Sequence, residues 1–472
     1  MNFIYIDLGL LALFCIFSAI FLYKNKHKVK REGFFFLYKT KFGLKFMDNF
    51  SKKFHKQLKV ISYLSITFGY FAMLIMVALL VYNLLVLIKM PVITNAPPIM
   101  PVIPYAPQIF KIQGLPNFYF IHWIIILAIM AITHEFAHGI LARHIKVKVK
   151  SSGFGFLGPL PLAFVEPDEK AMSKKKKKDQ LAMLSAGSFS NFIFFIIFGL
   201  IFLLFLSLSF YATTPLYSGA IINTSNINFI TIDQTNYSLN ELKNINLNIL
   251  SEKSIVYTEN SSFILTKDLF SQQYQNISNP KNKTIIAYYN APLINTDVKG
   301  EILEINRIKA TDPAAFTFLV NHTAPGQVID IKTTKDTYKI IADENPTNSS
   351  KGFIGISHRK LAKSFSEKLQ EDVLGIKNPF MAYEPFNRDI FPFLSVFMFW
   401  LVMLLFAIAT FNMLPFGFLD GGKFFYLTML GLTKSKKSAE TGYKIASLII
   451  VLLILAMVFV WLWRIYLFKI FM

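Results

Sequence analysis

The sequence predicts an α-helical polytopic membrane protein with about six transmembrane helices and one inserted α+β soluble region. Hydrophobic residues make up 54% of the 472 residues, and the mean hydropathy of +0.45 exceeds that of ordinary soluble chains. Six apolar runs are long enough to cross a bilayer. Between the fourth and fifth runs, residues 212–390 are instead rich in Asn, Ser and Thr and contain short β-branched stretches.

The predicted spans are apolar runs of about 20 residues or more. No basic stretch precedes the first span and no small-residue cleavage site follows it, so we expect an uncleaved anchor. The apolar piece 424–432 is too short to cross and is expected to form a surface or re-entrant helix. The six spans are 3–23, 60–89, 118–142, 181–211, 391–414 and 445–467.

The net charge of +21 is unevenly placed. Residues 212–390 hold 18 basic and 18 acidic residues, which leaves 31 basic and 10 acidic residues elsewhere. The positive-inside rule then predicts a multi-pass cell-membrane protein with its N-terminus and residues 212–390 outside the cytoplasm. Attraction to anionic lipid explains the lysines more simply than nucleic acid, which we do not expect as a partner. The basic segments are 24–59, 143–178 and 423–444.

Three regions follow from this pattern: a membrane region at 1–211 with four spans, an extracytoplasmic region at 212–390, and a membrane region at 391–472. Cys15 is the only cysteine, which excludes an intramolecular disulfide and a thiolate metal cluster.

Within the central region, apolar and polar residues alternate from about 284 to 345, which predicts β-strands. The predicted order is two strands, a turn at Asn306-Arg307, a helix at 312–320, a Pro-Gly turn and two more strands. This order resembles a PDZ domain, although Arg307 stands where that family usually has Gly. The resemblance implies a peptide ligand bound at a sheet edge. A small β-rich domain without a ligand is the alternative. Residues 223–283 have no interpretable pattern.

The third span contains His134-Glu135-Phe136-Ala137-His138. Histidines four residues apart on a helix share one face and can bind one tetrahedral metal ion. Glu135 could then take a proton from a metal-bound water. Such a pattern also arises by chance on solvated helices, but three ionisable groups in an apolar helix are costly unless they share a metal or line a wet cavity. The sequence therefore predicts a metal site within the membrane.

A tetrahedral site with two imidazoles needs a third protein ligand. Asp420 is the only carboxylate between Asp389 and Glu440, and it lies just beyond the predicted cytoplasmic end of its span. Pro415 and the pair Gly421-Gly422 would interrupt regular helix and let the backbone aim the carboxylate inward. A helix-capping role is the alternative for this aspartate.

The chain resembles the site-2 proteases, the family of intramembrane zinc metalloproteases, in the form found among archaeal members. The basic stretch 31–50 and the order of the spans agree with the resemblance. Four blocks carry it: HEFAHG at 134–139, GFGFLGPLPLAFVEPDEK at 153–170, LSAGSFSN at 184–191 and NMLPFGFLDGG at 412–422.

The resemblance implies a metalloendopeptidase that cleaves transmembrane protein substrates within or near a membrane helix, in regulated intramembrane proteolysis. It implies Zn²⁺ held by His134, His138 and Asp420, with Glu135 as the general base. Asn191 and Asn412 would bind the substrate backbone, although helix–helix hydrogen bonding is the alternative for Asn191.

Two other classes of function remain open at this point. A non-catalytic scaffold would bind partners through the PDZ-like domain, but every motif position is intact. A metal transporter would need ionisable residues along several spans. His122 is the only other ionisable residue in the third span, about three turns from His134.

Overall fold

The computed structural model divides into two compact units. The membrane unit comprises Met1–Phe202 and Phe393–Met472, and the central unit comprises Leu203–Pro392. Phe418 of the 412–422 motif and part of the predicted 212–390 region lie outside the described residues. The structure describes residues 3–471 except 34, 90–96, 113–114, 159, 246–249, 260, 280–282, 359–373, 376, 388–389 and 418.

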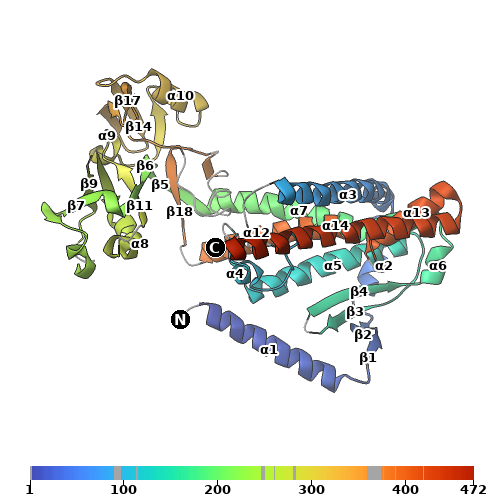
Figure 1. Cartoon of the computed structure of the whole chain (residues 1–472). Helices are drawn as coiled ribbons and strands as arrows, with labels where there is room; N and C mark the ends of the chain where they lie inside the picture. The colour runs from blue at the N-terminus through green and yellow to red at the C-terminus, as the bar shows by residue number, and fades with distance from the viewer. Residues whose placement is uncertain are drawn as a thin grey trace. The chain divides into compact units, whose positions relative to one another are not determined.

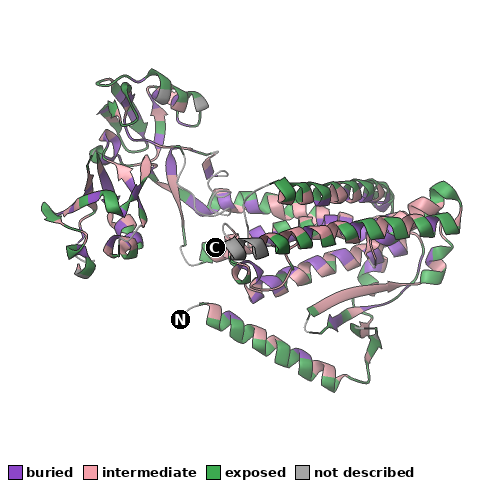
Figure 2. Ribbon diagram, viewed as in Figure 1, coloured by how far each residue is buried: buried purple, intermediate pink, exposed green. Residues whose placement is uncertain are grey.

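Among the residues that the structure describes, six helices are long and apolar enough to cross a membrane, as predicted (Figure 1). Much of their surface is exposed or half-buried (Figure 2), and large apolar side chains such as Leu74, Leu200 and Phe459 are exposed. Such a surface suits contact with lipid rather than water. The helices are α1 (Phe3–Lys24), α3 (His55–Lys89), α5 (Phe120–His144), α7 (Lys177–Ser209), α12 (Ile390–Phe411) and α14 (Lys436–Phe471).

A break in helical structure follows α12 and ends at α13 (Asp420–Thr433), the short helix predicted at 424–432. Pro415 lies in this break, where it cannot interrupt a helical hydrogen bond. Two side chains of α14 hold the segment: Tyr443 Oη donates to Gly417 O at 3.0 Å, and Ser447 Oγ donates to Pro415 O at 3.2 Å. The segment is therefore anchored to α14 before the chain enters α13.

A four-stranded antiparallel sheet joins two segments that are far apart in the sequence. Its strands, in spatial order, are β1 (Val29–Glu32), β2 (Phe35–Thr40), β3 (Val149–Leu157) and β4 (Leu160–Pro167). The block 153–170, which carries part of the family resemblance, thus lies largely in β3 and β4. Strand β4 ends the sheet and packs against α5, the helix that carries His134 and His138.

The central unit contains two larger antiparallel sheets. The first has the order β6-β11-β10-β9-β7-β8, and the second has the order β13-β12-β14-β15. The first is built from β6 (Gly219–Asn223), β7 (Ile227–Ile232), β8 (Thr235–Tyr237), β9 (Lys253–Thr258), β10 (Ser262–Thr266) and β11 (Thr284–Tyr289). The second is built from β12 (Ile302–Ile305), β13 (Ile308–Lys309), β14 (Val328–Thr333) and β15 (Thr337–Ile341).

The remaining elements of this unit surround the two sheets. They include η2 (Glu241–Asn244), α8 (Lys267–Ser278), α9 (Pro292–Thr296) and α10 (Pro313–His322). Two small two-stranded sheets pair β5 (Phe210–Pro215) with β18 (Met381–Pro385), and β16 (Asp343–Asn345) with β17 (Asn348–Phe353).

The two larger sheets contain the same four-stranded arrangement twice. The order β8-β7-β9-β10 in the first corresponds to β13-β12-β14-β15 in the second. Both copies have a two-residue hairpin turn with positive φ at each position, as type I′ turns require. Both also have one register irregularity at the start of the first strand. Equivalent strand pairs lie 75 residues apart: Ile227–Thr258 with Ile302–Thr333, and Ile230–Val256 with Ile305–Ile331.

A side-chain contact repeats as well. Thr258 Oγ1 donates to Ser261 O at 2.9 Å, and Thr333 Oγ1 donates to Asp336 O at 3.0 Å, so the same contact between residues three apart in the sequence occurs in each copy. The central unit therefore contains an internal structural repeat. The first copy falls largely in residues 223–283, where the sequence offered no pattern.

The strands and the helix predicted between 284 and 345 are present, and α10 extends to His322. One assignment differs: β11 pairs with β10 and β6 in the first sheet rather than with the second. Its short apolar run satisfies either sheet equally well, so periodicity alone could not choose between them.

Candidate metal centre

The histidines of α5 converge as their spacing predicts. His134 and His138 are both 8% exposed, and their Nε2 atoms lie 3.2 Å apart. Because residues four apart on a helix stand one above the other, no distortion of α5 is needed to bring the two rings together. Their approach leaves both Nε2 atoms facing the same point.

Asp420 reaches this point from the start of α13. Its Oδ2 lies 3.1 Å from His134 Nε2 and 3.2 Å from His138 Nε2. The N-cap of α13 is Leu419, so Asp420 is the first helical residue and its carboxylate faces the histidines rather than capping the helix. The capping alternative is therefore not the arrangement found.

Glycine at 421 allows α13 to begin this close to the preceding break. A Cβ there would collide with the backbone carbonyl groups of Met413 and Leu414. Instead, Gly421 N donates to Asn412 O at 2.8 Å, which ties the start of α13 to the end of α12. Asn412 thus contributes its backbone carbonyl to holding Asp420, and its predicted contact with substrate stays a prediction.

The three ligand atoms fit a zinc ion. Zinc binds nitrogen and oxygen ligands at about 2.0–2.2 Å, so two corners of its tetrahedron lie about 3.3–3.6 Å apart. The observed separations of 3.1–3.2 Å lie just below that range. Two imidazoles and one carboxylate also leave a fourth position open, as catalytic zinc sites require. His134, His138 and Asp420 could therefore hold the ion after a small outward movement of their ligand atoms.

The outer nitrogens of both rings have partners. His138 Nδ1 lies 2.7 Å from Met183 O of α7, and a proton on Nδ1 leaves Nε2 free for a metal. Asn191, fully buried on α7, places its Nδ2 3.5 Å from His134 Nδ1 and accepts from Thr133 Oγ1 at 2.8 Å. This contact with α5 is the helix–helix hydrogen bond considered as the alternative for Asn191, and substrate binding by this residue stays a prediction.

Gly187 of α7 lies directly over the two rings. A Cβ at this position would lie 2.5 Å from His138 Nε2 and 2.6 Å from His134 Nε2. A Cβ cannot approach a ring nitrogen so closely, so any larger side chain at position 187 would displace the Nε2 atoms of the two histidines. Glycine is thus the only residue type at this position that lets α7 pack on the histidines in this geometry.

We expect Gly187→Ala to lower metal affinity about 10- to 100-fold, because small displacements around ligands have effects of that order. Overpacking should also destabilise the protein by about 1–3 kcal/mol. Gly199→Ala on the same helix is the matched control, since its Cβ would meet only Val402 at 4.0 Å. Metal titration of both variants in detergent decides the point: equal affinities in the two variants would contradict the role given to Gly187.

Glu135 connects α5 to the sheet. Its Oε2 accepts from Val165 N of β4 at 2.9 Å, so the carboxylate lies between the edge strand and the histidine face. The next residue of β4, Glu166, accepts from Ser151 Oγ at 2.5 Å and from Lys39 Nζ at 3.0 Å. These bonds, first that from Ser151, hold the pKa of Glu166 below its usual range. Cross-strand bonds thus fix β4 beside the site.

Asp7 was not predicted from the sequence to have a role near the site. This fully buried carboxylate of α1 accepts from Phe120 N at 2.7 Å, Ile121 N at 3.0 Å and Tyr105 Oη at 2.6 Å. It therefore caps the start of α5 from another helix, where free amides and the helix dipole favour a negative charge. Burial and then the Asp7 bond raise the pKa of Tyr105. A lone carboxylate in an apolar span was the signal that could have revealed it.

Membrane-spanning helices, a two-histidine and carboxylate centre, and an adjacent glutamate together define a membrane metallopeptidase. The model of peptidase family M50 matches residues 122–457, and the chain belongs to this family, the site-2 protease family. The chain is also similar to the uncharacterized protein MJ0971 of Methanocaldococcus jannaschii, with 48% identity over 75 residues. That match covers 16% of this chain and 20% of the relative.

Proposed function

We propose that the protein is a zinc-dependent endopeptidase that hydrolyses a peptide bond within or near a transmembrane helix of membrane-protein substrates. The observation that carries this proposal is the convergence of His134, His138 and Asp420 beside Glu135, on a helix apolar enough to span a membrane. Membership of family M50 supports peptidase chemistry. The apolar surroundings of the centre support a substrate that also lies in the bilayer.

The roles of the residues follow from their positions. His134, His138 and Asp420 would hold zinc, which supplies Lewis acidity that polarises a carbonyl and acidifies a water. Glu135 would take the proton of that water at a carboxylate oxygen and deliver it to the amine nitrogen as the peptide bond breaks. For His134 to use Nε2, its proton must be on Nδ1. The Asn191 amide would then turn its oxygen toward that proton and its NH₂ toward Thr133 Oγ1.

The substrate backbone must be extended before it can be cut, because the amides of a helix are held in hydrogen bonds. Strand β4 is the last strand of its sheet and already donates one backbone amide to Glu135. An extended segment added along this edge would lie next to the general base. Weak helix formers such as Gly near the scissile bond would ease the unwinding.

Two alternatives receive less support from the site. A scaffold that binds partners through the central unit would not need three side chains that converge to hold a metal ion with a glutamate beside them. A transporter would need a polar relay, yet both ring nitrogens of buried His122 lack a partner among the described residues, and its neighbours include Tyr119 and Phe393. A peptide ligand of the PDZ-like region stays part of the proposal.

We expect residues 212–390 to be accessible to label from outside intact cells, and Lys174–Lys178 to be labelled only after permeabilisation. The reason is that the basic excess lies wholly outside the central region. Single cysteines placed at exposed positions in each segment, in a Cys15→Ser background, provide the measurement. Labelling of the lysine run in intact cells would overturn the orientation and place the metal centre nearer the opposite face.

The substrate class is tested by co-expression with single-span membrane proteins. One substrate is full-length and the other has its soluble outer domain already removed, and each is paired with wild type and with Glu135→Gln. We expect a released fragment with wild type alone, and faster cutting of the trimmed substrate if the central unit excludes bulky outer domains. Fragments that form equally with Glu135→Gln would assign the cleavage to another protease.

A further inference from the structure

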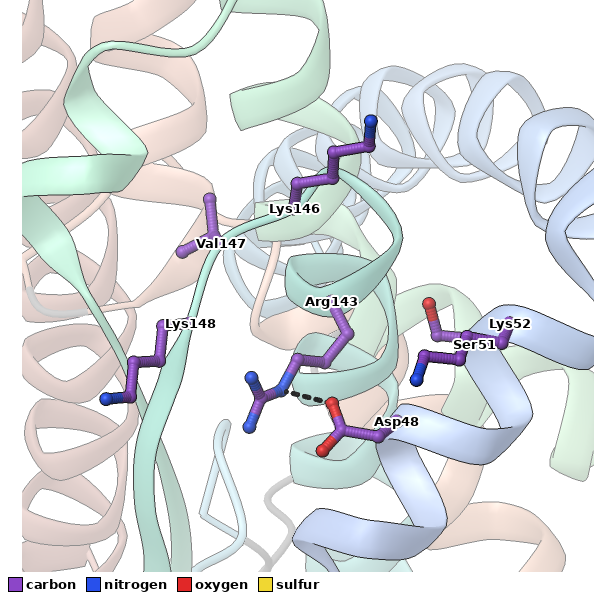
Figure 3. Close-up of a pocket in the computed structure, with 7 residues that line it drawn as sticks. All are labelled: Asp48, Ser51, Lys52, Arg143, Lys146, Val147 and Lys148. Carbon is purple, nitrogen blue, oxygen red and sulfur yellow. Dashed lines mark ion pairs between the residues drawn. The ribbon is translucent and has the colours of Figure 1, made fainter.

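A polar pocket of about 420 Å³ lies where α5 ends, between α2 (Leu44–Lys53) and the start of β3 (Figure 3). It is separate from the metal centre: Arg143, its contribution from α5, follows His138 by more than one helical turn. Four of its lining residues are cations and one is an acid. The lining residues are Asp48, Ser51, Lys52, Arg143, Lys146, Val147 and Lys148.

The charges in this pocket do not balance. Arg143 Nε pairs with Asp48 Oδ1 at 3.0 Å, as the dashed line in Figure 3 marks, and its Nη2 donates to Val149 O at 3.2 Å. Within the part of the chain that the structure describes, no ion pair joins Lys52, Lys146 or Lys148 to an acid. Because a guanidinium has five donors, Arg143 also keeps donors for another ligand.

The walls of the pocket are held in place. Met47 of α2 is fully buried, and a Cβ on Gly139 of α5 would collide with its sulfur. Helix α2 therefore packs tightly against α5 immediately beside the pocket. The backbone of the site therefore needs little ordering before a ligand binds. The side chains of Lys52, Lys146 and Lys148 are exposed, and Figure 3 shows Lys146 and Lys148 extended away from Arg143, so these lysines would turn toward a bound anion.

Lys146 has a conformation that lysine rarely adopts. Its φ is 59°, and it ends α5 through the paired bonds Lys146 N to Arg143 O at 3.0 Å and Val147 N to Ala142 O at 2.8 Å. This is a Schellman motif, whose left-handed position is usually Gly because a Cβ is disfavoured there. Arg143, in the last turn of α5, already places a positive charge at the end of this helix, where the helix dipole favours one. The left-handed position does not by itself indicate a function, since Lys434 ends α13 in the same conformation; what distinguishes Lys146 is that it lines the pocket.

We propose that this pocket binds a phosphate-bearing anion, held by Arg143 together with Lys52, Lys146 and Lys148. A phosphate group carries up to two negative charges and several acceptor oxygens, which matches a guanidinium fork and three free ammonium groups. The volume exceeds that of a single carboxylate. The anion is either an anionic lipid headgroup at the end of the span or a phosphate ester from solution.

The test uses purified full-length protein in a neutral detergent, with glycerol phosphate and phosphatidylglycerol as probes, and thermal stabilisation as the measurement. Each probe that binds should raise the melting temperature in a saturable way. Lys146→Gly should weaken binding about tenfold through loss of one charged hydrogen bond. It should not lower the melting temperature without anion, because Gly adopts the left-handed conformation freely.

Lys434→Gly is the matched control. Lys434 also ends a helix in the left-handed conformation, with a φ of 55°, and it does not line the pocket. The substitution Lys434→Gly removes the same charge and the same backbone strain as Lys146→Gly. Because Lys434 lies outside the pocket, this substitution should leave anion binding unchanged. Stabilisation by glycerol phosphate would assign a soluble anion, and stabilisation by the lipid alone would assign a headgroup. The proposal fails if neither probe stabilises wild type, or if the two variants bind equally.

Discussion

Asp420→Ala is expected to lose bound metal while the protein still inserts and folds. The carboxylate is one of three ligands, and its removal leaves two imidazoles on one helix. Mutation of a hydrogen-bond partner of a metal ligand typically lowers metal affinity about 10- to 100-fold. Loss of a ligand itself should therefore lower metal affinity by at least about 100-fold. Metal content per protein, measured by mass spectrometry after purification in detergent, is the readout. His138→Ala should behave in the same way.

A matched carboxylate separates this effect from a general change of charge. Glu169 is exposed, lies 3.9 Å from Lys423 of α13, and takes no part in the centre. Glu169→Ala should therefore keep one metal ion per protein. Wild-type metal content in Asp420→Ala would remove Asp420 from the site and leave its contact with both histidines without the role proposed here.

Glu135→Gln is expected to keep the metal and the fold and to lose turnover by about 10²- to 10⁴-fold, the usual range for removal of a general base. The glutamine amide oxygen can still accept from Val165 N, so the link between α5 and β4 survives. The loss should appear in kcat with little change in KM, because the interaction is made in the transition state.

Glu135→Ala provides the comparison for this second prediction. It removes both the proton acceptor and the bond to β4, so it should also lower stability or raise KM. If Glu135→Gln instead loses its metal as completely as Asp420→Ala, then Glu135 acts as a ligand or a structural group. Equal turnover in wild type and Glu135→Gln would exclude it as the base.

The parts of the site that the sequence predicted depend on local spacing or on a rare residue. His134 and His138 lie on one face of any regular α-helix because they are four residues apart. Asp420 was identifiable because it is the only carboxylate between Asp389 and Glu440. The contacts that support them were not predictable in this way. Asp7 meets Phe120 across 113 residues, and Gly187 is explained only once α7 is seen against the rings.

The spans were predictable because apolar length is a strong signal, whereas the first repeat of the central unit was not. The first copy of the repeat lacks the Pro-Gly turn that the second copy has. It also contains the four-residue helix η2 at the position where the second copy contains the ten-residue helix α10. What the copies share is strand register and turn conformation, and many sequences satisfy both. The repeat became recognisable only from the pairing of Ile227 with Thr258 and of Ile302 with Thr333.

The most direct measurement is the mass of the products formed from one single-span substrate by purified enzyme in lipid. We expect new termini within or near the hydrophobic span, formed by wild type with zinc and absent with Glu135→Gln and with Asp420→Ala. Cleavage confined to a soluble tail of the substrate, or products that persist undiminished in Glu135→Gln, would contradict it.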